Sequence, residues 1–539
     1  MTLLFLLDLI MLERASLREA SQLFNNFVHK HIIINKINIE RDGNENDLLD
    51  YFRTISKEDI SGGRTTFTFD NSLTLDLSDI KRFWQNYKNG LNNLSHVFSK
   101  SLGTEDRLRS VNPPKNIKLS QESYNHPIHH LQANDELESK FSNYFKQAFG
   151  TDLIVHRNAG NEVPLYVGER PIPKKNEDRV SLNYIKEIEK LDLLHQQGDG
   201  MRSFVGVLLN AFISKHSVLF IDEPEAFLHP PQARLLGKML AKDLPSERQL
   251  FLATHSEDFL KGLLDANTKN LKIIRLQRNG TINNASILDN IDINKIWNDS
   301  LLRHSNVLNG LFHSKVIICE SDSDCRFFSA LLSAQFDDTG SIAPDVLFIH
   351  CGGKHRMPTV IKALKNLNVN LKVISDFDLL NDINPLKQIF EDLEGDWKEV
   401  EKDWKLVKKE IELKRPEYLT EDVKTDINKI LTETVDRIFP KEKISAIQKT
   451  LKKASPWTEA KEVGKPYIPS GNATQSFEKM QQKFKEKGLV ILEVGELECF
   501  AKSIGNHGPK WVTEVLAKDL KNDTELEIAR QFVLENIAK

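Results

Sequence analysis

The stretch Ser217-Val-Leu-Phe-Ile-Asp-Glu-Pro-Glu-Ala-Phe-Leu-His-Pro230, followed by Leu250-Phe-Leu-Ala-Thr-His-Ser256, decides the fold of this chain. Each piece is a short apolar run that ends abruptly in polar residues. Such a run is typical of a strand buried in a parallel sheet, which delivers polar side chains to a ligand at its carboxyl end. The two pieces therefore predict two buried strands with a nucleotide site at their tips.

The polar residues at these tips suit a nucleoside triphosphate. Asp222 can hold a magnesium ion, and Glu223 can polarise a water molecule for attack on a γ-phosphate. His255 stands where a γ-phosphate sensor is needed. Two core strands with acidic tips are the alternative, because loop carboxylates are common. The order of an acidic pair, Pro, His and then Thr-His-Ser resembles the Walker B motif, D-loop and H-loop of ABC-type ATPases, which include the SMC, RecF and OLD (overcoming lysogenization defect) proteins.

The resemblance implies a signature loop upstream of the Walker B strand, in a site formed between two heads. Here Leu194-His-Gln-Gln-Gly-Asp-Gly-Met-Arg-Ser203 precedes an apolar helix that we expect over residues 204–213. Backbone N–H groups and a helix N-terminus would then face a phosphate. A flexible Gly-rich linker is the alternative. Glutamines stand where ABC signatures usually have Ser, but three residues keep the chemistry of the loop: Gly198, Gly200 and Ser203.

Length and charge bound the organisation of the chain. At 539 residues it should hold two or three domains, because single cores stop growing at about 250 to 300 residues. The formal net charge of −4, from 73 basic and 77 acidic residues, gives no overall nucleic-acid footprint. Any contact with DNA must therefore come from local patches.

Cysteine usage and the amino terminus favour a cytoplasmic protein. The opening Met1–Arg14 is apolar, but it carries Asp8, has no basic leading region or cleavage site, and is too short to span a bilayer. We therefore expect neither secretion nor a membrane anchor. The chain has four cysteines without paired metal spacing or a disulfide framework, which indicates a reducing compartment; they are Cys319, Cys325, Cys351 and Cys499.

No Gly-x-x-x-x-Gly-Lys-Ser/Thr occurs in the sequence, and Gly62–Thr66, the nearest candidate, lacks the Lys and the spacing. Leu6–Ala15 can be encoded as TTA TTG GAC CTA ATA ATG CTG GAA AGA GC. The frame that begins at the third base reads Ile-Gly-Pro-Asn-Asn-Ala-Gly-Lys-Ser, a full P-loop directly before a predicted helix at Ser16–Phe24. We expect that this amino terminus is an out-of-frame reading, and that an intact relative binds ATP.

The predicted head covers residues 1–300. Strand patterns at 31–35, 65–69 and 73–77 suit the antiparallel edge of such a head. An amphipathic helix at 136–149 and a hairpin of 153–157 with 163–167 are expected in a dimerisation insertion near 115–180. Packing of the helix on its own domain is an equally good interpretation. A strand at 271–276 and an Asn-Gly turn follow, and a boundary is expected near 295–312.

A second candidate functional region begins at Lys315-Val-Ile-Ile-Cys-Glu-Ser-Asp-Ser-Asp-Cys-Arg-Phe-Phe328. A strand is expected to end at Glu320 and a helix to open with Ser and Asp caps, which places Glu320 near Asp324. Val346-Leu-Phe-Ile-His-Cys-Gly-Gly-Lys354 predicts a strand and a Gly-Gly turn. In Leu371-Lys-Val-Ile-Ser-Asp-Phe-Asp378 the carboxylates of Asp376 and Asp378 would share one side of a strand end, because side chains two apart point the same way.

Each of these motifs alone is also explained by a capped turn. All three in order resemble the Toprim domain of OLD-family nucleases, topoisomerases and primases, which we expect over residues 312–539. Residues 384–487 predict a helical insertion, either with a solvated charged face or as a clamp on nucleic acid through Lys405–Lys414 or Lys449–Lys453. The resemblance then implies a further metal-binding carboxylate at Glu498, with Glu496 a weaker choice. Asn506–Lys510 predicts a helix-capping loop, or a Lys for the scissile phosphate.

The fold class expected is α/β: an ABC-type ATPase head followed by a Toprim domain. The residues and the resemblance together indicate a DNA endonuclease that uses two Mg²⁺ or Mn²⁺ ions to hydrolyse phosphodiesters. Topoisomerases need a Tyr nucleophile and primases a nucleotide-addition site, and neither is identifiable. The alternative is a RecF- or SMC-like DNA-binding ATPase with a non-catalytic Toprim module. The resemblance also implies a homodimer or larger homo-oligomer, a role in antiphage defence and a helicase-like or other defence partner. The expected metal ligands are Glu320, Asp324, Asp376, Asp378 and Glu498.

Overall fold

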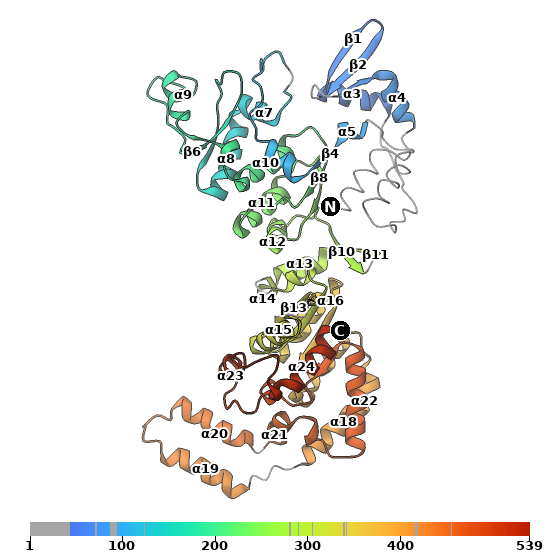
Figure 1. The fold of residues 1–539 in the computed structure, drawn as a ribbon, viewed down its shortest axis with the longest axis vertical. Coiled ribbons are helices and arrows are strands. Elements are labelled where there is room, and N and C mark those ends of the chain that lie inside the picture. Colours follow the sequence, from blue (N-terminus) through green and yellow to red (C-terminus); the bar gives the residue numbers. More distant parts are fainter. Residues whose placement is uncertain are drawn as a thin grey trace. The chain divides into compact units, whose positions relative to one another are not determined.

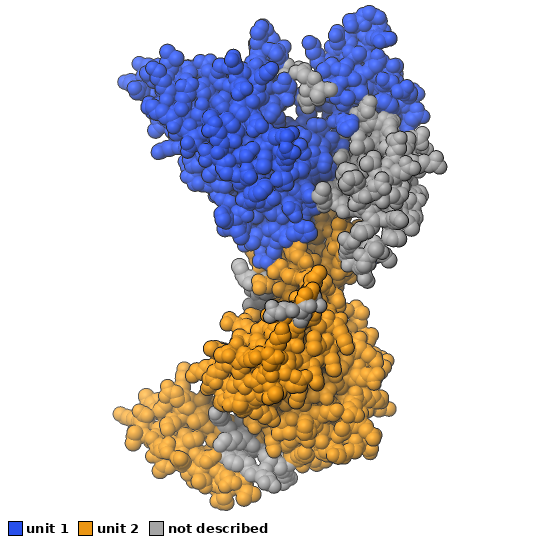
Figure 2. Space-filling view, in the orientation of Figure 1, with its two compact units in different colours: residues 1–271, 278–284 blue, residues 272–277, 285–539 orange. Residues whose placement is uncertain are grey.

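The computed structural model describes residues 44–69, 73–86, 94–122, 124–279, 282–288, 290–303, 306–337, 340, 342–414, 419–453 and 455–539. The chain divides into two compact units, residues 1–271 with 278–284 and residues 272–277 with 285–539 (Figure 2). This division lies upstream of the boundary expected near residues 295–312.

The first unit is built on a parallel sheet in the order β4 (Ser99–Leu102), β8 (Val218–Asp222) and β9 (Gln249–Ala253). Strands β8 and β9 are the two strands expected from the motif, and they pair in register from Val218 opposite Gln249 to Asp222 opposite Ala253. Because the strands are parallel, their carboxyl ends meet at one edge. The prediction of two neighbouring buried strands with polar tips is confirmed.

Helices α10 (Asp199–Ile213), α11 (Pro230–Asp243) and α12 (Glu257–Asp265) pack beside this sheet (Figure 1). They share one hydrophobic core with β8. Ten residues of α10 are buried, and seven of them belong to this core, so the helix is apolar over most of its surface. The short helix α6 (Thr104–Arg109) follows β4 and packs against α10.

The segment expected as a dimerisation insertion is part of the same unit. It contains α7 (Pro127–Ala133) and α8 (Asp135–Phe149) with the antiparallel strands β5 (Asp152–Val155) and β6 (Leu165–Gly168). Helix α9 (Leu182–Ile188) and strand β7 (Asp192–Leu193), which pairs with β6, follow directly after it. The predicted hairpin is confirmed by the pairing of β5 with β6. Helix α8 buries Phe141 and Phe145 in the core of its own unit. This packing accounts for the amphipathic pattern, and a dimer contact stays a prediction.

A small antiparallel sheet of β1 (Lys57–Ser61), β2 (Arg64–Phe69) and β3 (Leu73–Asp76) packs against α3 (Glu45–Ile55) and α4 (Leu77–Gln85). The alternating patterns predicted β2 and β3. Strand β1 was missed, because Lys-Glu-Asp-Ile-Ser has no apolar face and four of its five residues are exposed. A short helix α5 (Ser95–Phe98) leads into β4. The predicted strand at 31–35, the helix at 16–24 and the out-of-frame segment lie outside the described residues.

Strands β10 (Ile273–Asn279) and β11 (Ile282–Leu288) pair with each other, which fits the strand and turn expected there. They are followed by α13 (Asn290–Asn298), α14 (Ser300–Arg303) and a 3₁₀ turn at Asn306–Leu311.

The second unit holds a parallel sheet in the order β13 (Val346–His350), β12 (Lys315–Cys319), β14 (Leu371–Ser375) and β15 (Leu489–Ile491). Helices α15 (Asp322–Phe336) and α16 (Met357–Asn366) connect the first strands. The chain ends in α23 (Pro509–Val515), α24 (Glu527–Val533) and a last turn at Leu534–Ala538, which pack with α15 around the fully buried Trp511. The Glu320, Gly-Gly and Asp-x-Asp motifs therefore follow three strands of one sheet, as expected.

Between β14 and β15 lies the predicted helical insertion (Figure 1). Helix α18 (Trp397–Leu413) buries Trp397, Trp404 and Ile411, and the indole of Trp404 donates to the carbonyl of Leu380 at 2.8 Å. By contrast, α19 (Thr420–Thr432) has no buried residue and packs against α20 (Lys441–Lys453). The helices are α17 (Ile383–Asp392), α18 (Trp397–Leu413), α19 (Thr420–Thr432), α20 (Lys441–Lys453), α21 (Pro456–Val463) and α22 (Asn472–Glu486). In the part of the chain that the structure describes, no helix is long and apolar enough to cross a membrane.

Candidate functional site

A first group of carboxylates lies at the carboxyl ends of β12 and β14. Glu320, Asp376 and Asp378 each offer an oxygen, and these oxygens lie within 4.8 Å of one another. Glu320 follows β12 directly, and its Oε1 accepts hydrogen bonds from the Ser375 hydroxyl and from the Asp376 N–H at 3.3 Å. The end of β14 therefore fixes the orientation of the Glu320 carboxylate.

Asp376 and Asp378 converge for a reason other than the one expected. Strand β14 ends at Ser375, and the chain then enters a 3₁₀ turn over Phe377–Asn381 with Asp376 at its N-cap. The turn, rather than strand alternation, brings the two carboxylates together. The N–H of Phe377 donates to the Gly495 carbonyl at 2.8 Å, which joins this turn to the loop after β15.

Asp324 is not one of these three carboxylates, but it lies near enough for Glu320 and Glu498 to raise its pKa. It caps its own helix, since its carboxylate accepts the Ser321 N–H at 2.8 Å in a reciprocal capping box. Burial raises the pKa of Asp324 to about 6, against the opposing effect of the Ser321 hydrogen bonds and with a further contribution from Glu320. The sequence pattern predicted the cap correctly, and the expected role of Asp324 as a metal ligand stays a prediction.

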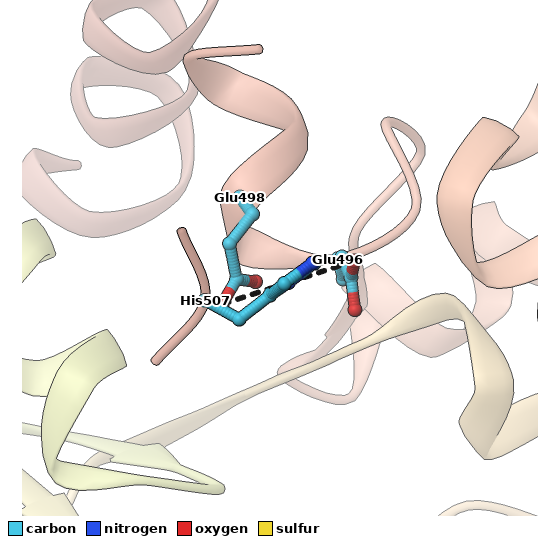
Figure 3. Close-up of side chains that lie close together, drawn as sticks. All are labelled: Glu496, Glu498 and His507. Carbon is cyan, nitrogen blue, oxygen red and sulfur yellow. Dashed lines mark ion pairs between the residues drawn. The ribbon is translucent and has the colours of Figure 1, made fainter. Parts of the chain in front are cut away.

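A second group contains Glu496, Glu498 and His507 (Figure 3). Glu498 accepts the Gly508 N–H at 2.7 Å, and His507 Nδ1 lies 3.9 Å from Glu496 and 3.8 Å from Glu498. Glu496 and Glu498 thus contribute alike, although the resemblance favoured Glu498. His507 was missed, and the only signal was its place in the capping loop. Gly508 caps α23, which leaves Lys510 exposed in the first turn of that helix.

A lysine from the helical insertion joins the two groups. The ammonium of Lys461, on α21, lies 3.0 Å from Asp376 Oδ2, 3.8 Å from Asp378 Oδ1 and 3.7 Å from Glu496 Oε2. A second lysine, Lys354 of the Gly-Gly turn, lies 3.2 Å from Asp378 Oδ2. Neither lysine was recognised from the sequence as part of this site.

The electrostatics of these groups suit cations. Burial raises the pKa of Asp376 well above its ordinary value; Lys461 opposes this rise, and Glu320 and Asp324 add to it. Burial and the neighbouring Glu498 raise the pKa of Glu496. For Lys461, burial alone would lower the pKa, but Asp376 and Asp378 more than offset it and raise the pKa. Carboxylates gathered in this way repel one another unless a cation lies among them. Their all-oxygen donor set in the first group fits Mg²⁺ or Mn²⁺.

In the first unit, Asp222 ends β8 as expected, and Glu223 follows it in an exposed position with φ of 46°. The fully buried Arg107 donates to the backbone carbonyl of Asp222 and to Thr104 Oγ1 at 3.3 Å. Burial lowers the pKa of Arg107, while the carboxylate of Glu225 does most to oppose this. Arg107 therefore brings a positive charge to the Walker B edge, and sequence reasoning missed it.

The third carboxylate of this stretch, Glu225, is bound to the tip of β9. Thr254 Oγ1 donates to Glu225 at 2.5 Å, and burial raises the pKa of Glu225. His255, one residue further, is exposed. The structure therefore brings Asp222, Glu225 and Thr254 to one sheet edge, with Glu223 and His255 facing solvent there.

The signature stretch differs from its prediction. Helix α10 begins at Asp199 rather than near Phe204, with Gly198 as its N-cap. An acidic residue in the first turn stabilises a helix start through the helix dipole, and Asp199 supplies it here. Gly200 and Ser203 consequently lie inside the helix, and Ser203 is fully buried. A Cβ at Gly200 would lie 2.8 Å from the Phe227 carbonyl, so this glycine allows α10 to approach the turn after β8.

The nearest candidate for a phosphate loop is a hairpin turn. Gly62 and Gly63 have positive φ and connect β1 to β2, with Ser61 paired to Arg64. This turn belongs to a different sheet from β8, so it does not complete the Walker B site.

Two family models match the chain. Residues 105–260 match an AAA domain described as putative AbiEii toxin, type IV TA system, and residues 311–378 match the Toprim domain of overcoming lysogenization defect protein-like proteins. The chain therefore combines an ATPase domain with a Toprim domain. Its Toprim segment is of the OLD type, and the resemblance to the OLD family predicted from the motifs is confirmed.

Two solved structures are similar to parts of the chain. One comes from work titled "Structural biochemistry of ATP-driven dimerization and DNA stimulated activation of SMC ATPases". Its sequence is 12% identical, the match covers 32% of this chain and 94% of that chain, and the TM-score is 0.21. The other is an Smc head bound to the C-winged helix domain of ScpA. Its sequence is 13% identical, the match covers 43% of this chain and 67% of that chain, and the TM-score is 0.28. No curated protein matches the chain.

Proposed function

We propose that this chain is a metal-dependent DNA endonuclease whose nuclease centre comprises Glu320, Asp376 and Asp378 with Glu496 and Glu498. The observation that carries the proposal is Lys461: one ammonium lies within 4 Å of carboxylates from both groups. The two groups are therefore neighbours, and together they offer ligands for two cations.

In this proposal Glu320, Asp376 and Asp378 would hold the first metal ion, and Glu496, Glu498 and His507 would hold the second. The ions would supply an activated water molecule and stabilise the leaving oxygen of the phosphodiester. Ser375 keeps Glu320 turned toward the site, and the Gly508 N–H does the same for Glu498. Such supporting hydrogen bonds orient metal ligands before the ion arrives. Asp324 keeps β12 and α15 in place through its cap.

The ATPase domain regulates the nuclease in this proposal. Asp222 would bind magnesium, Glu223 would orient the attacking water, and His255 would sense the γ-phosphate in an intact relative. Gly198 would offer its loop to a phosphate across a homodimer. Because the sequence contains no P-loop, this chain is expected to bind ATP weakly. We further propose a role in antiphage defence, which the resemblance to the OLD family implies, and a place in the cytoplasm, which the four cysteines without paired metal spacing favour.

Product analysis tests the proposal against a DNA-binding ATPase with a non-catalytic Toprim module. Purified full-length protein is incubated with supercoiled plasmid and Mn²⁺ or Mg²⁺, and the nicked ends are examined for free 3′-hydroxyl and 5′-phosphate groups. Hydrolysis in which the 3′-oxygen leaves should yield both groups, and EDTA should prevent nicking. DNA binding without any metal-dependent nicking would favour the alternative. Asp392→Asn, a carboxylate outside both groups that accepts only from Gln388 among side chains, is a matched control that should nick like the wild type.

A further inference from the structure

Close backbone contacts fix the position of Lys461 beside the carboxylates of the proposed nuclease centre. Gly464, which ends α21 with φ of 72°, and Gly495, with φ of 113°, lie where a Cβ would collide with the carbonyls of Glu493 and Lys461 respectively. The Lys465 N–H also donates to the Glu493 carbonyl at 2.8 Å. Helix α21 is thus locked backbone to backbone against the loop that carries Glu496.

From this fixed backbone, the Lys461 side chain extends to carboxylates of both groups. It is one-third exposed, and its ammonium reaches Asp376, Asp378 and Glu496 at 3.0, 3.8 and 3.7 Å. Lys354, by comparison, pairs with Asp378 and Asp382 and with no member of the second group. Lys461 is therefore the cation that bridges the two groups.

An ammonium in this place contacts carboxylates that a metal ion in the centre would also need. Asp376 Oδ2 is at hydrogen-bond distance from Lys461, and one carboxylate oxygen cannot serve a close ammonium and a divalent cation at full strength together, because the two positive charges repel. A lysine side chain has four rotatable bonds, so its ammonium can leave while its backbone remains locked.

We propose that Lys461 is a tethered cation that occupies the nuclease centre before metal binds, and that a divalent ion must displace it from Asp376. The inference rests on the proposed metal centre. It makes Lys461 a positioning residue: it holds Asp376, Asp378 and Glu496 together in the metal-free enzyme and sets the metal concentration at which the centre fills. Because Lys461 lies on α21, the helical insertion would thereby help to set the metal dependence of the nuclease.

Metal affinity distinguishes this role from a purely structural one. Lys461→Met keeps most of the stem and removes the ammonium. The variant should bind Mn²⁺ about tenfold more tightly in calorimetric titration of EDTA-stripped full-length protein, since the ion no longer breaks a charge-assisted hydrogen bond. A lysine that merely supports the site would give the opposite result, weaker binding, when removed.

The matched control is Lys465→Met, four residues along, whose ammonium pairs with Glu478 and Glu493 outside both groups. It should leave the Kd for Mn²⁺ unchanged. In EDTA the Tm of Lys461→Met should fall below that of the wild type, and saturating Mn²⁺ should raise it by more than in the wild type. Lys461→Gln is the second variant if Lys461→Met does not fold.

The outcomes separate the two proposals. If the wild type binds Mn²⁺ and both Lys461 variants bind it equally or more weakly, displacement is wrong and the metal centre stands. If neither the wild type nor the variants bind Mn²⁺, the metal centre and the tethered cation are both wrong.

Discussion

The hydroxyl of Ser375 donates a hydrogen bond to the carboxylate of Glu320, joining the tips of two adjacent parallel strands. Removing this donor leaves the fold of β14 intact but frees the Glu320 carboxylate. Ser375→Ala should therefore raise the Mn²⁺ concentration for half-maximal nicking by about tenfold or more, the usual effect of losing a residue that orients a metal ligand. Ser333→Ala, an exposed serine on α15, is the control. Equal metal dependence in both variants would show that Ser375 does not orient Glu320.

Asp324 predicts a pH dependence of stability. Its pKa of about 6 in the fold exceeds the ordinary value of 3.8, so the folded protein holds this proton where the unfolded chain has lost it. Stability from this group is present below pH 3.8 and is lost as the pH rises to about 6. Asp324→Asn carries no such titration. Measured by urea unfolding in EDTA, its stability relative to the wild type should increase between pH 4 and pH 7, by up to about 3 kcal/mol. A constant difference over this range would contradict the raised pKa.

Gly206 supports the Walker B edge through Arg107. A Cβ at Gly206 would collide with the Arg107 carbonyl, and Arg107 in turn binds the Asp222 carbonyl. Gly206→Ala should destabilise the head by about 1–3 kcal/mol, the usual cost of overpacking. Gly160→Ala is the matched control in the same unit, because nothing lies within 4 Å of its added Cβ. Thermal unfolding of the two variants makes the comparison, and equal Tm values would mean that α6 and α10 are not in close contact.

Nucleotide should have little effect on this chain. Asp222 and Glu223 lack a P-loop partner in the sequence, so ATP binding is expected to be weak or absent and nicking nearly independent of ATP. Restoring the out-of-frame Gly-Pro-Asn-Asn-Ala-Gly-Lys-Ser segment with its preceding strand should bring ATP binding back. Titration of ATP into binding and nicking assays makes the test. Submicromolar binding by the chain as written, or a large change in nicking rate, would refute this account of the head.

Much of this fold could be predicted from the sequence, because it is built on parallel strands. Their buried apolar runs stop at polar tips, so β8, β9, β12, β13, β14 and β15 could all be predicted, and Glu320, Asp376 and Asp222 with them. Strand β1 could not, because it is an exposed edge without an apolar face. The start of α10 was placed too late, because two glycines before an apolar run resemble a loop while Asp199 already begins the helix.

The candidate site was only partly predictable, since sequence motifs find residues near their own strand tips. Asp378 was assigned for the wrong geometric reason, because a 3₁₀ turn rather than strand alternation sets its direction. Lys461 comes from an insertion whose charge pattern also suits a solvated surface, so only tertiary packing reveals its place. His507 likewise reaches Glu496 and Glu498 through a loop without a metal-ligand spacing.

The double variant Asp376→Ala/Asp378→Ala tests the central claim most directly. Removing both side chains takes two of the three oxygens from the first group and also relieves carboxylate repulsion, so the protein should stay folded. The measurement is the rate of Mn²⁺-dependent plasmid nicking beside wild-type protein and Asp392→Asn, with circular dichroism to verify the fold. The account predicts loss of nicking in a folded double variant and wild-type nicking in the control. Full nicking by the double variant would contradict it.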